Sequence, residues 1–158
     1  MTPETKDTKA DKQLLIAVDD SDSSRRTVVY VANLLGGFPG FSVSLLSIIP
    51  DTEEDFFENE AERKKWIKEK FTAADVMLER YRQILIQSGF PEDNVRYRSC
   101  LGETKSLSDA ILETHCDITC CTVVVGRHPK TKTEEFLFGS TSNRLIHEAR
   151  DCAVWVVA

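Results

Sequence analysis

The sequence predicts an α/β fold, an open sheet of five parallel strands with helices on both faces. Apolar runs of strand length alternate along the chain with stretches of helical periodicity, in the order β-α-β-α-β-α-β-α-β. Most of the apolar runs are continuous, which is typical of strands covered on both faces. The length of 158 residues suits one domain, which we expect over residues 13–158.

The first expected strand covers residues 13–18, after a polar tail of residues 1–12 that we expect to be flexible. Residues 19–24 are rich in Asp and Ser, which favour helix N-caps and place acidic charge near a helix start. A helix with an apolar stripe follows. The pair Gly36-Gly37 ends it, because glycine tolerates the left-handed closing conformation.

The second unit repeats this order. A strand over residues 41–49 is closed by Pro50, and the acidic residues 51–60 form a loop or a first helical turn. A long helix then runs to about Ser88, and Gly89 follows it. Its apolar stripe, which we expect to pack against the sheet, is Ile67, Phe71, Ala74, Leu78, Tyr81 and Leu85.

The second half of the chain holds three shorter strands. Residues 94–100 have few strongly apolar side chains, so this strand is expected at a sheet edge. A helix over residues 106–115 leads to a strand over 118–125. A helix over residues 140–150 precedes the last strand, Ala153–Val157.

Composition excludes several classes of function. There are 20 basic and 26 acidic residues, a net charge of −6, and the pI is about 5.1. Nothing global therefore attracts the phosphate backbone of a nucleic acid. No apolar run reaches the length of a membrane span, and the polar start lacks the apolar core of a signal peptide. We expect a cytoplasmic protein that binds neither nucleic acid nor membrane.

The five cysteines do not indicate a disulfide framework, because their number is odd and no export signal precedes them. Cys116, Cys120 and Cys121 lie near His115, but they lack the CxxC pair typical of zinc sites. Adjacent strand residues point to opposite faces, so Cys120 and Cys121 could not share a metal. We expect small buried side chains and no metal site.

Ligands of such sheets lie at the carboxyl ends of the strands, where the strand order reverses. The loops over residues 19–24 and 126–141 are therefore the places to search. In the second loop Gly139 and Ser140 begin a helix, whose unpaired N–H groups and dipole favour an anion. The hydroxyls of Ser140 and Thr141 add donors. Four side chains that can carry positive charge complete a candidate phosphate clamp: Arg127, His128, Lys130 and Lys132. The alternative is a capped helix after a mobile loop.

These motifs resemble the universal stress protein family. Gly126, two residues, Pro129, nine residues and Gly139-Ser140 keep the spacing of its nucleotide-binding members. Residues 15–21 are similar to its opening strand and Asp-Gly-Ser turn, and the resemblance extends over residues 12–158. Asp20, Pro129 and Ala153 stand where the family commonly has Gly, Gly and Pro.

The resemblance implies a Rossmann-like sheet with strand order 3-2-1-4-5 and binding of ATP or AMP. Mg²⁺ could bridge the phosphates, although no dedicated set of carboxylates is visible for it. Asp19 and Val43 would face the adenosine, whereas Gly126, Gly139, Ser140 and Thr141 would hold ribose and phosphates. The whole predicted nucleotide site is Ala17, Val18, Asp19, Val43, Gly126, Arg127, His128, Pro129, Gly139, Ser140, Thr141 and Ser142.

Other nucleotide and hydrolase classes lack their motifs here. There is no GxxxxGK[ST], no GxGxxG after the first strand and no nucleophile elbow, and we predict no catalytic residues and at most slow ATP hydrolysis. Two hypotheses remain: a nucleotide-binding stress or signalling module, and a nucleotide-free dimeric interaction protein of the same fold. Pro129, which has no N–H for a phosphate, favours the second, whereas Asp19, Gly126 and Gly139-Ser140 favour the first. For either, we expect a homodimer formed by the uncharged edge strand Ala153–Val157, and a protein partner that the sequence does not name.

Overall fold

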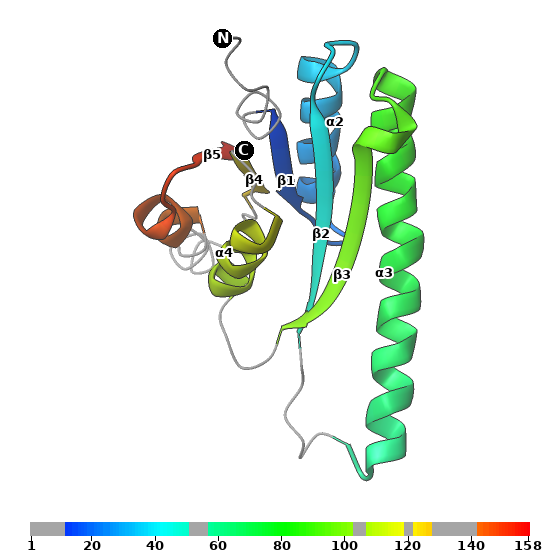
Figure 1. The fold of residues 1–158 in the computed structure, drawn as a ribbon. Helices are drawn as coiled ribbons and strands as arrows, with labels where there is room; N and C mark the ends of the chain where they lie inside the picture. Colours follow the sequence, from blue (N-terminus) through cyan, green and yellow to red (C-terminus); the bar gives the residue numbers. More distant parts are fainter. Residues whose placement is uncertain (1–11, 51–56, 103–106, 119–121, 128–141) are drawn as a thin grey trace, which may run out of the picture.

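The computed structural model describes residues 12–50, 57–102, 107–118, 122–127 and 142–158. Five parallel strands form one sheet in the order β3-β2-β1-β4-β5, which confirms the predicted fold and strand order (Figure 1). The strands are β1 (Gln13–Ala17), β2 (Ser42–Pro50), β3 (Val95–Gly102), β4 (Thr122–Gly126) and β5 (Ala153–Val157). The helices are α2 (Asp22–Leu35), α3 (Glu60–Ser88), the 3₁₀ turn η2 (Glu92–Asn94) and α4 (Leu107–Ile118), and residues 142–148 are helical too.

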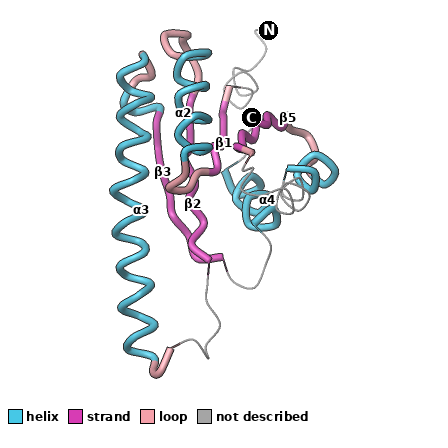
Figure 2. Tube along the Cα trace, turned by 180° about the vertical axis from the view of Figure 1, so that it is seen from behind, coloured by secondary structure: helices cyan, strands magenta, loops and turns pink. Residues whose placement is uncertain are grey.

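Two apolar cores lie on the two faces of the sheet, because side chains alternate along each strand. Helices α2 and α3 cover one face of the sheet, as the view from behind in Figure 2 shows. In the core on this face, Val28 of α2 and Leu78 of α3 belong to one cluster with Ile16 of β1. On the other face, Ile111 of α4 and Leu145 of the last helix belong to a second cluster. The predicted helices on both faces are thus confirmed.

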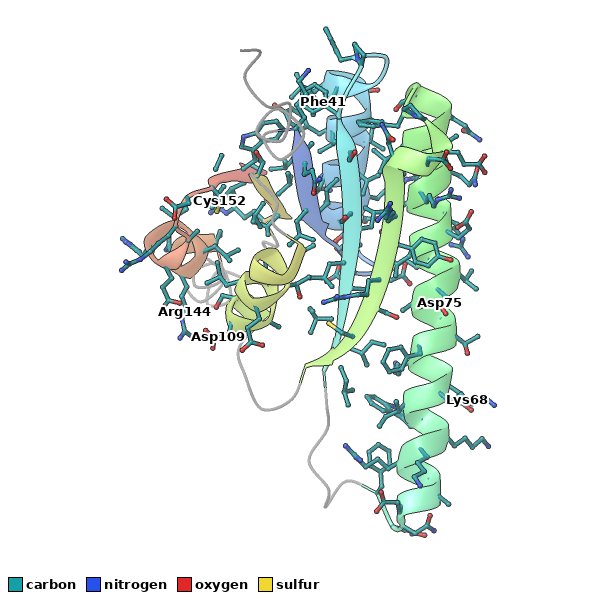
Figure 3. The ribbon with its side chains drawn as sticks, in the orientation of Figure 1. Phe41, Lys68, Asp75, Asp109, Arg144 and Cys152 are labelled. Carbon is teal, nitrogen blue, oxygen red and sulfur yellow. The ribbon has the colours of Figure 1, made fainter. Side chains whose placement is uncertain are left out.

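An ion pair joins the two helices of the second face. Arg144 Nη2 lies 3.4 Å from Asp109 Oδ1 of α4, and both residues are labelled in Figure 3. Both side chains are partly exposed, so the pair adds little to stability. It links the last helix to α4, and the two helices also share the apolar cluster of Ile111 and Leu145.

The strand predicted over residues 118–125 is wrong at its start. Ile118 is the last residue of α4, and β4 begins at Thr122. The apolar position 118 continues the helical spacing of Ile111 and Thr114, so the sequence pattern alone joined it to the apolar run that follows. The predictions for β1, β2 and β5 agree with the structure to within one residue.

Among the described residues, no helix combines the length and the apolar character needed to cross a bilayer. The tail predicted over residues 1–12 lies outside the described residues except for Lys12.

Candidate functional site

The carboxyl ends of β1 and β4 lie side by side at the point where the strand order reverses. Ala17 is paired with Val125, so the residues that leave the two strands, Asp19 and Arg127, emerge at the same edge. From β1 the chain continues to β2 on one side, while β4 lies on the other side. This is the position at which open parallel sheets bind ligands.

Asp19 is held by side chains from two helices. The Val18 N–H donates to the Leu46 carbonyl at 2.8 Å, so Val18 is still paired with β2. The Asp19 N–H then donates to Ser24 Oγ at 2.9 Å, and the Ser24 hydroxyl donates to Asp19 Oδ1 at 2.8 Å. The Tyr81 hydroxyl donates to the Asp19 carbonyl at 2.8 Å. The exposed Asp19 is thus held by two buried residues: Ser24 bonds its N–H and its carboxylate, and Tyr81 bonds its backbone carbonyl.

Helix α2 begins within this turn, as the Asp/Ser cluster predicted. Ser21 is the N-cap and accepts a hydrogen bond from the Ser24 N–H at 3.1 Å. Asp22 lies in the first turn, where its negative charge complements the helix dipole. The turn after β1 is therefore fixed at both of its ends.

Gly126 brings α2 against β4. A β-carbon built on Gly126 would lie 2.6 Å from Ser23 Oγ and 2.7 Å from Thr27 Oγ1. The Ser23 hydroxyl donates to the Arg127 carbonyl at 2.7 Å, and the Arg127 N–H donates to the Val157 carbonyl at 2.9 Å. The absence of a side chain at Gly126 thus serves helix packing as well as any approach of a ligand.

Five of the predicted site residues come together at this edge: Ala17, Val18, Asp19, Gly126 and Arg127. Ser142 stands at the start of the helical residues 142–148. The other predicted residues of the second loop lie outside the described residues; they are His128, Pro129, Gly139, Ser140 and Thr141.

Val43, predicted to face the adenosine, does not lie at this edge. It is paired with Leu14 near the amino ends of the strands, and only 1% of its surface is exposed. Because Leu46 of β2 is the partner of Ala17, the β2 residues at the carboxyl edge are those after Leu46, beginning with Ser47 and Ile48. The apolar run of β2 carries no mark of this register, so the sequence could not supply it.

Sequence reasoning also missed Ser24 and Tyr81. Ser24 lay in the cluster predicted to cap α2, but its bonds to Asp19 depend on how the turn folds. Tyr81 was assigned to the apolar stripe of α3 and is indeed 93% buried. Its hydroxyl is the one signal that could have been used, since a buried tyrosine hydroxyl requires a partner.

An open groove of about 980 Å³ runs between the start of α2 and the middle of α3, with Tyr81 among its lining residues. Its charged lining residues are Asp20, Asp22, Arg25, Asp75, Glu79 and Arg80. Burial raises the pKa of the Tyr81 hydroxyl above its ordinary value, and the negative charges of Asp20 and Asp19 raise it further. The hydroxyl therefore remains a proton donor to Asp19 at neutral pH.

No group of three or more His, Cys, Asp or Glu side chains in the described part of the chain is arranged to hold a metal ion. The predicted cysteine positions 116, 120 and 121 lie where the structure describes no side chain.

Comparison with solved structures finds the same fold in several proteins. A universal stress protein in complex with cAMP is 18% identical, with a TM-score of 0.69 over 94% of this chain and 98% of that chain. The hypothetical protein MJ0577 is 22% identical, with a TM-score of 0.74 over 94% and 96%. The universal stress protein from Archaeoglobus fulgidus in complex with dAMP is 18% identical, with a TM-score of 0.59 over 92% and 97%.

No curated protein matches the chain. The model of the universal stress protein family does match it, over residues 12–158. The match covers nearly the whole chain, including the carboxyl ends of β1 and β4. This protein therefore belongs to the universal stress protein family.

Proposed function

We propose that this protein binds an adenine nucleotide, ATP or AMP, at the edge formed by Asp19, Gly126 and Arg127. In this proposal nucleotide occupancy alters the surface around the site, and the protein acts as a stress-response or signalling module. The observation that carries the proposal is the position of the exposed Asp19, aimed by Ser24 and Tyr81, next to the exit of β4. A fixed acceptor at the switch point of a parallel sheet suits a nucleoside.

Two solved relatives support adenine as the base. One universal stress protein of the same fold was determined in complex with cAMP and another in complex with dAMP. Both ligands are adenine nucleotides. Each of these two proteins is 18% identical to this chain, and we propose the same class of ligand for it.

The residues at the edge suit the two ends of such a ligand. The Asp19 carboxylate can accept hydrogen bonds from ribose hydroxyls or from the adenine amino group. Arg127, with His128, Lys130 and Lys132 of the following loop, supplies positive charge for phosphates. In the same proposal Gly139, Ser140 and Thr141, which precede the helical residues 142–148 in the sequence, donate to phosphate. ATP is the preferred ligand, because these cations favour a triphosphate.

Mg²⁺ would be held mainly by the phosphates. The described residues contain no cluster of three carboxylate, imidazole or thiolate groups for it. We also propose that ATP hydrolysis is slow or absent, since fast phosphoryl transfer needs a positioned water or base. The Asp19 side chain is engaged by the Ser24 hydroxyl, which suits a binding residue.

The second candidate is a nucleotide-free dimeric interaction protein of the same fold. Pro129 favours it, because proline occupies the place of the family's second glycine and has no N–H for a phosphate. Both candidates include a homodimer through β5 and an unidentified protein partner, and for both we propose the cytoplasm as the compartment.

Extracted nucleotide and calorimetry separate the two candidates. The purified protein is denatured and its supernatant is analysed for ATP and AMP, and the nucleotide-free protein is titrated with each at millimolar concentration. We expect binding by the wild type, weaker but measurable binding in Asp19→Ala, and tighter binding in Pro129→Gly, which restores an N–H. If the wild type binds no nucleotide, the nucleotide proposal is wrong and the interaction protein remains; binding by Pro129→Gly alone would assign the loss to Pro129.

A further inference from the structure

The backbone polar groups of Asp19 are satisfied by side chains instead of by strand pairing. Its N–H donates to Ser24 Oγ at 2.9 Å, and its carbonyl accepts from the Tyr81 hydroxyl at 2.8 Å. The Ser24 hydroxyl also donates to the Asp19 carboxylate. The direction of the carboxylate therefore depends on one residue of α2 and one residue of α3.

The two residues that hold Asp19 come from different parts of the chain. Ser24 belongs to the same turn and follows Asp19 by five residues. Tyr81 is 62 residues away in the sequence, on a helix that otherwise packs against β2, β3 and α2. Its ring lies in the core with Met77, Leu78 and Leu85, so the packing of α3 sets where the hydroxyl lies. Through this hydrogen bond, the position of α3 affects the position of Asp19 at the edge of the sheet.

We infer that Tyr81 is a positioning residue of the ligand site, which acts through Asp19 and makes ligand affinity depend on the position of α3. This inference rests on the proposed function, since Asp19 is taken as a residue that contacts the nucleotide. Tyr81 also lines the groove between α2 and α3, together with Asp20 and Asp22 of the same turn. A change in the spacing of α2 and α3 would therefore change the affinity for the ligand.

The test is a double-mutant cycle with Asp19. Tyr81→Phe keeps the buried ring and removes only the hydroxyl, so the packing of α3 is preserved. We expect the nucleotide affinity to fall about three- to tenfold, as for the loss of one hydrogen bond. In the Asp19→Ala background the same change should leave the residual affinity within about twofold, because no side chain remains to be aimed. A merely structural role would weaken binding equally in both backgrounds.

A matched control is Tyr97→Phe, since Tyr97 is an exposed tyrosine on β3 and should leave the affinity unchanged. Thermal unfolding of every variant shows whether it is folded. Equal losses in the two Asp19 backgrounds would overturn the inference, and so would an unchanged affinity in Tyr81→Phe.

Hydrogen exchange separates this inference from the proposed function. We expect the Asp19 amide, which donates to Ser24, to exchange faster in Tyr81→Phe than in the wild type, with Tyr97→Phe unchanged. If the wild type binds no nucleotide but this amide exchanges faster, the proposed function fails and the control of Asp19 by Tyr81 stands. If the exchange rate is unchanged, the positioning role is overturned whether or not nucleotide binds.

Discussion

The Ser23 side chain occupies the space in which a Gly126 side chain would have to lie. A β-carbon on Gly126 would stand 2.6 Å from Ser23 Oγ, and the hydroxyl donates to the next carbonyl, that of Arg127. The first turn of α2 is thus seated directly on the end of β4. Gly126, predicted as a phosphate-binding residue, has a packing role that requires no ligand.

Gly126→Ala should therefore lower the free energy of unfolding by about 1–3 kcal/mol, as expected for overpacking at a tight contact. Urea unfolding measures it. Ser23→Ala combined with Gly126→Ala should recover part of the loss, because the closest atom is removed while Thr27 Oγ1, at 2.7 Å, remains. A Gly126→Ala protein as stable as the wild type would contradict this packing role.

A second close contact joins the ends of α2 and α3. A β-carbon on Gly89 would lie 2.6 Å from the Gly37 nitrogen, and Gly89 has a φ of +122°, a conformation that other residues rarely adopt. Gly37 also has a positive φ, +89°, but open space surrounds its α-carbon. A substitution at Gly37 therefore measures the cost of backbone strain alone, whereas one at Gly89 adds the cost of the steric contact.

Gly37→Ala should cost on the order of 1–2 kcal/mol from strain alone. Gly89→Ala adds the backbone contact and should cost more, on the order of 3 kcal/mol. Urea denaturation of both variants, compared at equal m-value, gives the difference. Similar losses in the two variants would show that the backbone at Gly37 can move away at little cost.

The sequence predicted the layers better than the register. Continuous apolar runs and one long stripe identified the strands and α3, because burial on both faces leaves a strong pattern. Val43 and Ile48 both belong to one apolar run, and only the pairing of Leu46 with Ala17 decides which of them nears the site. The boundary at Ile118 failed for the same reason, since an apolar residue fits the end of a helix or the start of a strand.

The sequence indicated the two loops of the candidate site, but not Ser24 and Tyr81, the residues that hold Asp19. The loops after β1 and β4 were predicted because a loop after a parallel strand is a known ligand position. Within them, the binding roles of Asp19 and Gly126 came from the resemblance to the universal stress protein family. The bond from Tyr81 joins residues 62 positions apart, and no local pattern encodes such a distance. Tyr81 reads as one more apolar member of its helix until the fold brings its hydroxyl to Asp19.

The bond from Tyr81 to Asp19 predicts a pH dependence of stability. Burial, Asp20 and Asp19 raise the pKa of Tyr81, so the folded protein holds this proton more tightly than the unfolded chain. Its contribution is therefore complete below the unfolded pKa of about 10 and is lost as the pH rises through the folded pKa. Tyr81→Phe should be less stable than the wild type by about 1 kcal/mol near neutral pH.

That difference should shrink at alkaline pH, since the wild type then loses the same bond. Guanidinium unfolding of both proteins, at a series of pH values that starts near neutral and rises above the unfolded pKa of about 10, follows this loss. If the difference in stability stays constant over the series, ionisation of the Tyr81 hydroxyl is not linked to unfolding.

β5 is the last strand in the order of the described sheet, and we expect its outer edge to form a dimer interface. Val156 is 39% exposed and, with Tyr30, Leu34 and Trp155, it lines a shallow hollow of about 480 Å³ on the α2 side of the sheet. The Val157 carbonyl accepts from Arg127, so the polar groups of Val157 face β4 and those of Val156 face outward. An uncharged edge with apolar neighbours is suited to pairing with a second copy about a two-fold axis.

Val156→Pro should give a monomer, because it removes an outward N–H and leaves the pairing of β4 with β5 intact. Val156→Thr is the matched control: it keeps the N–H and the branched shape, and it should remain a dimer. Light scattering after size exclusion, at micromolar protein, distinguishes these states. A monomeric wild type would refute the dimer, while a dimeric Val156→Pro would require an interface on another surface, since no outward pairing at this position would remain to explain it.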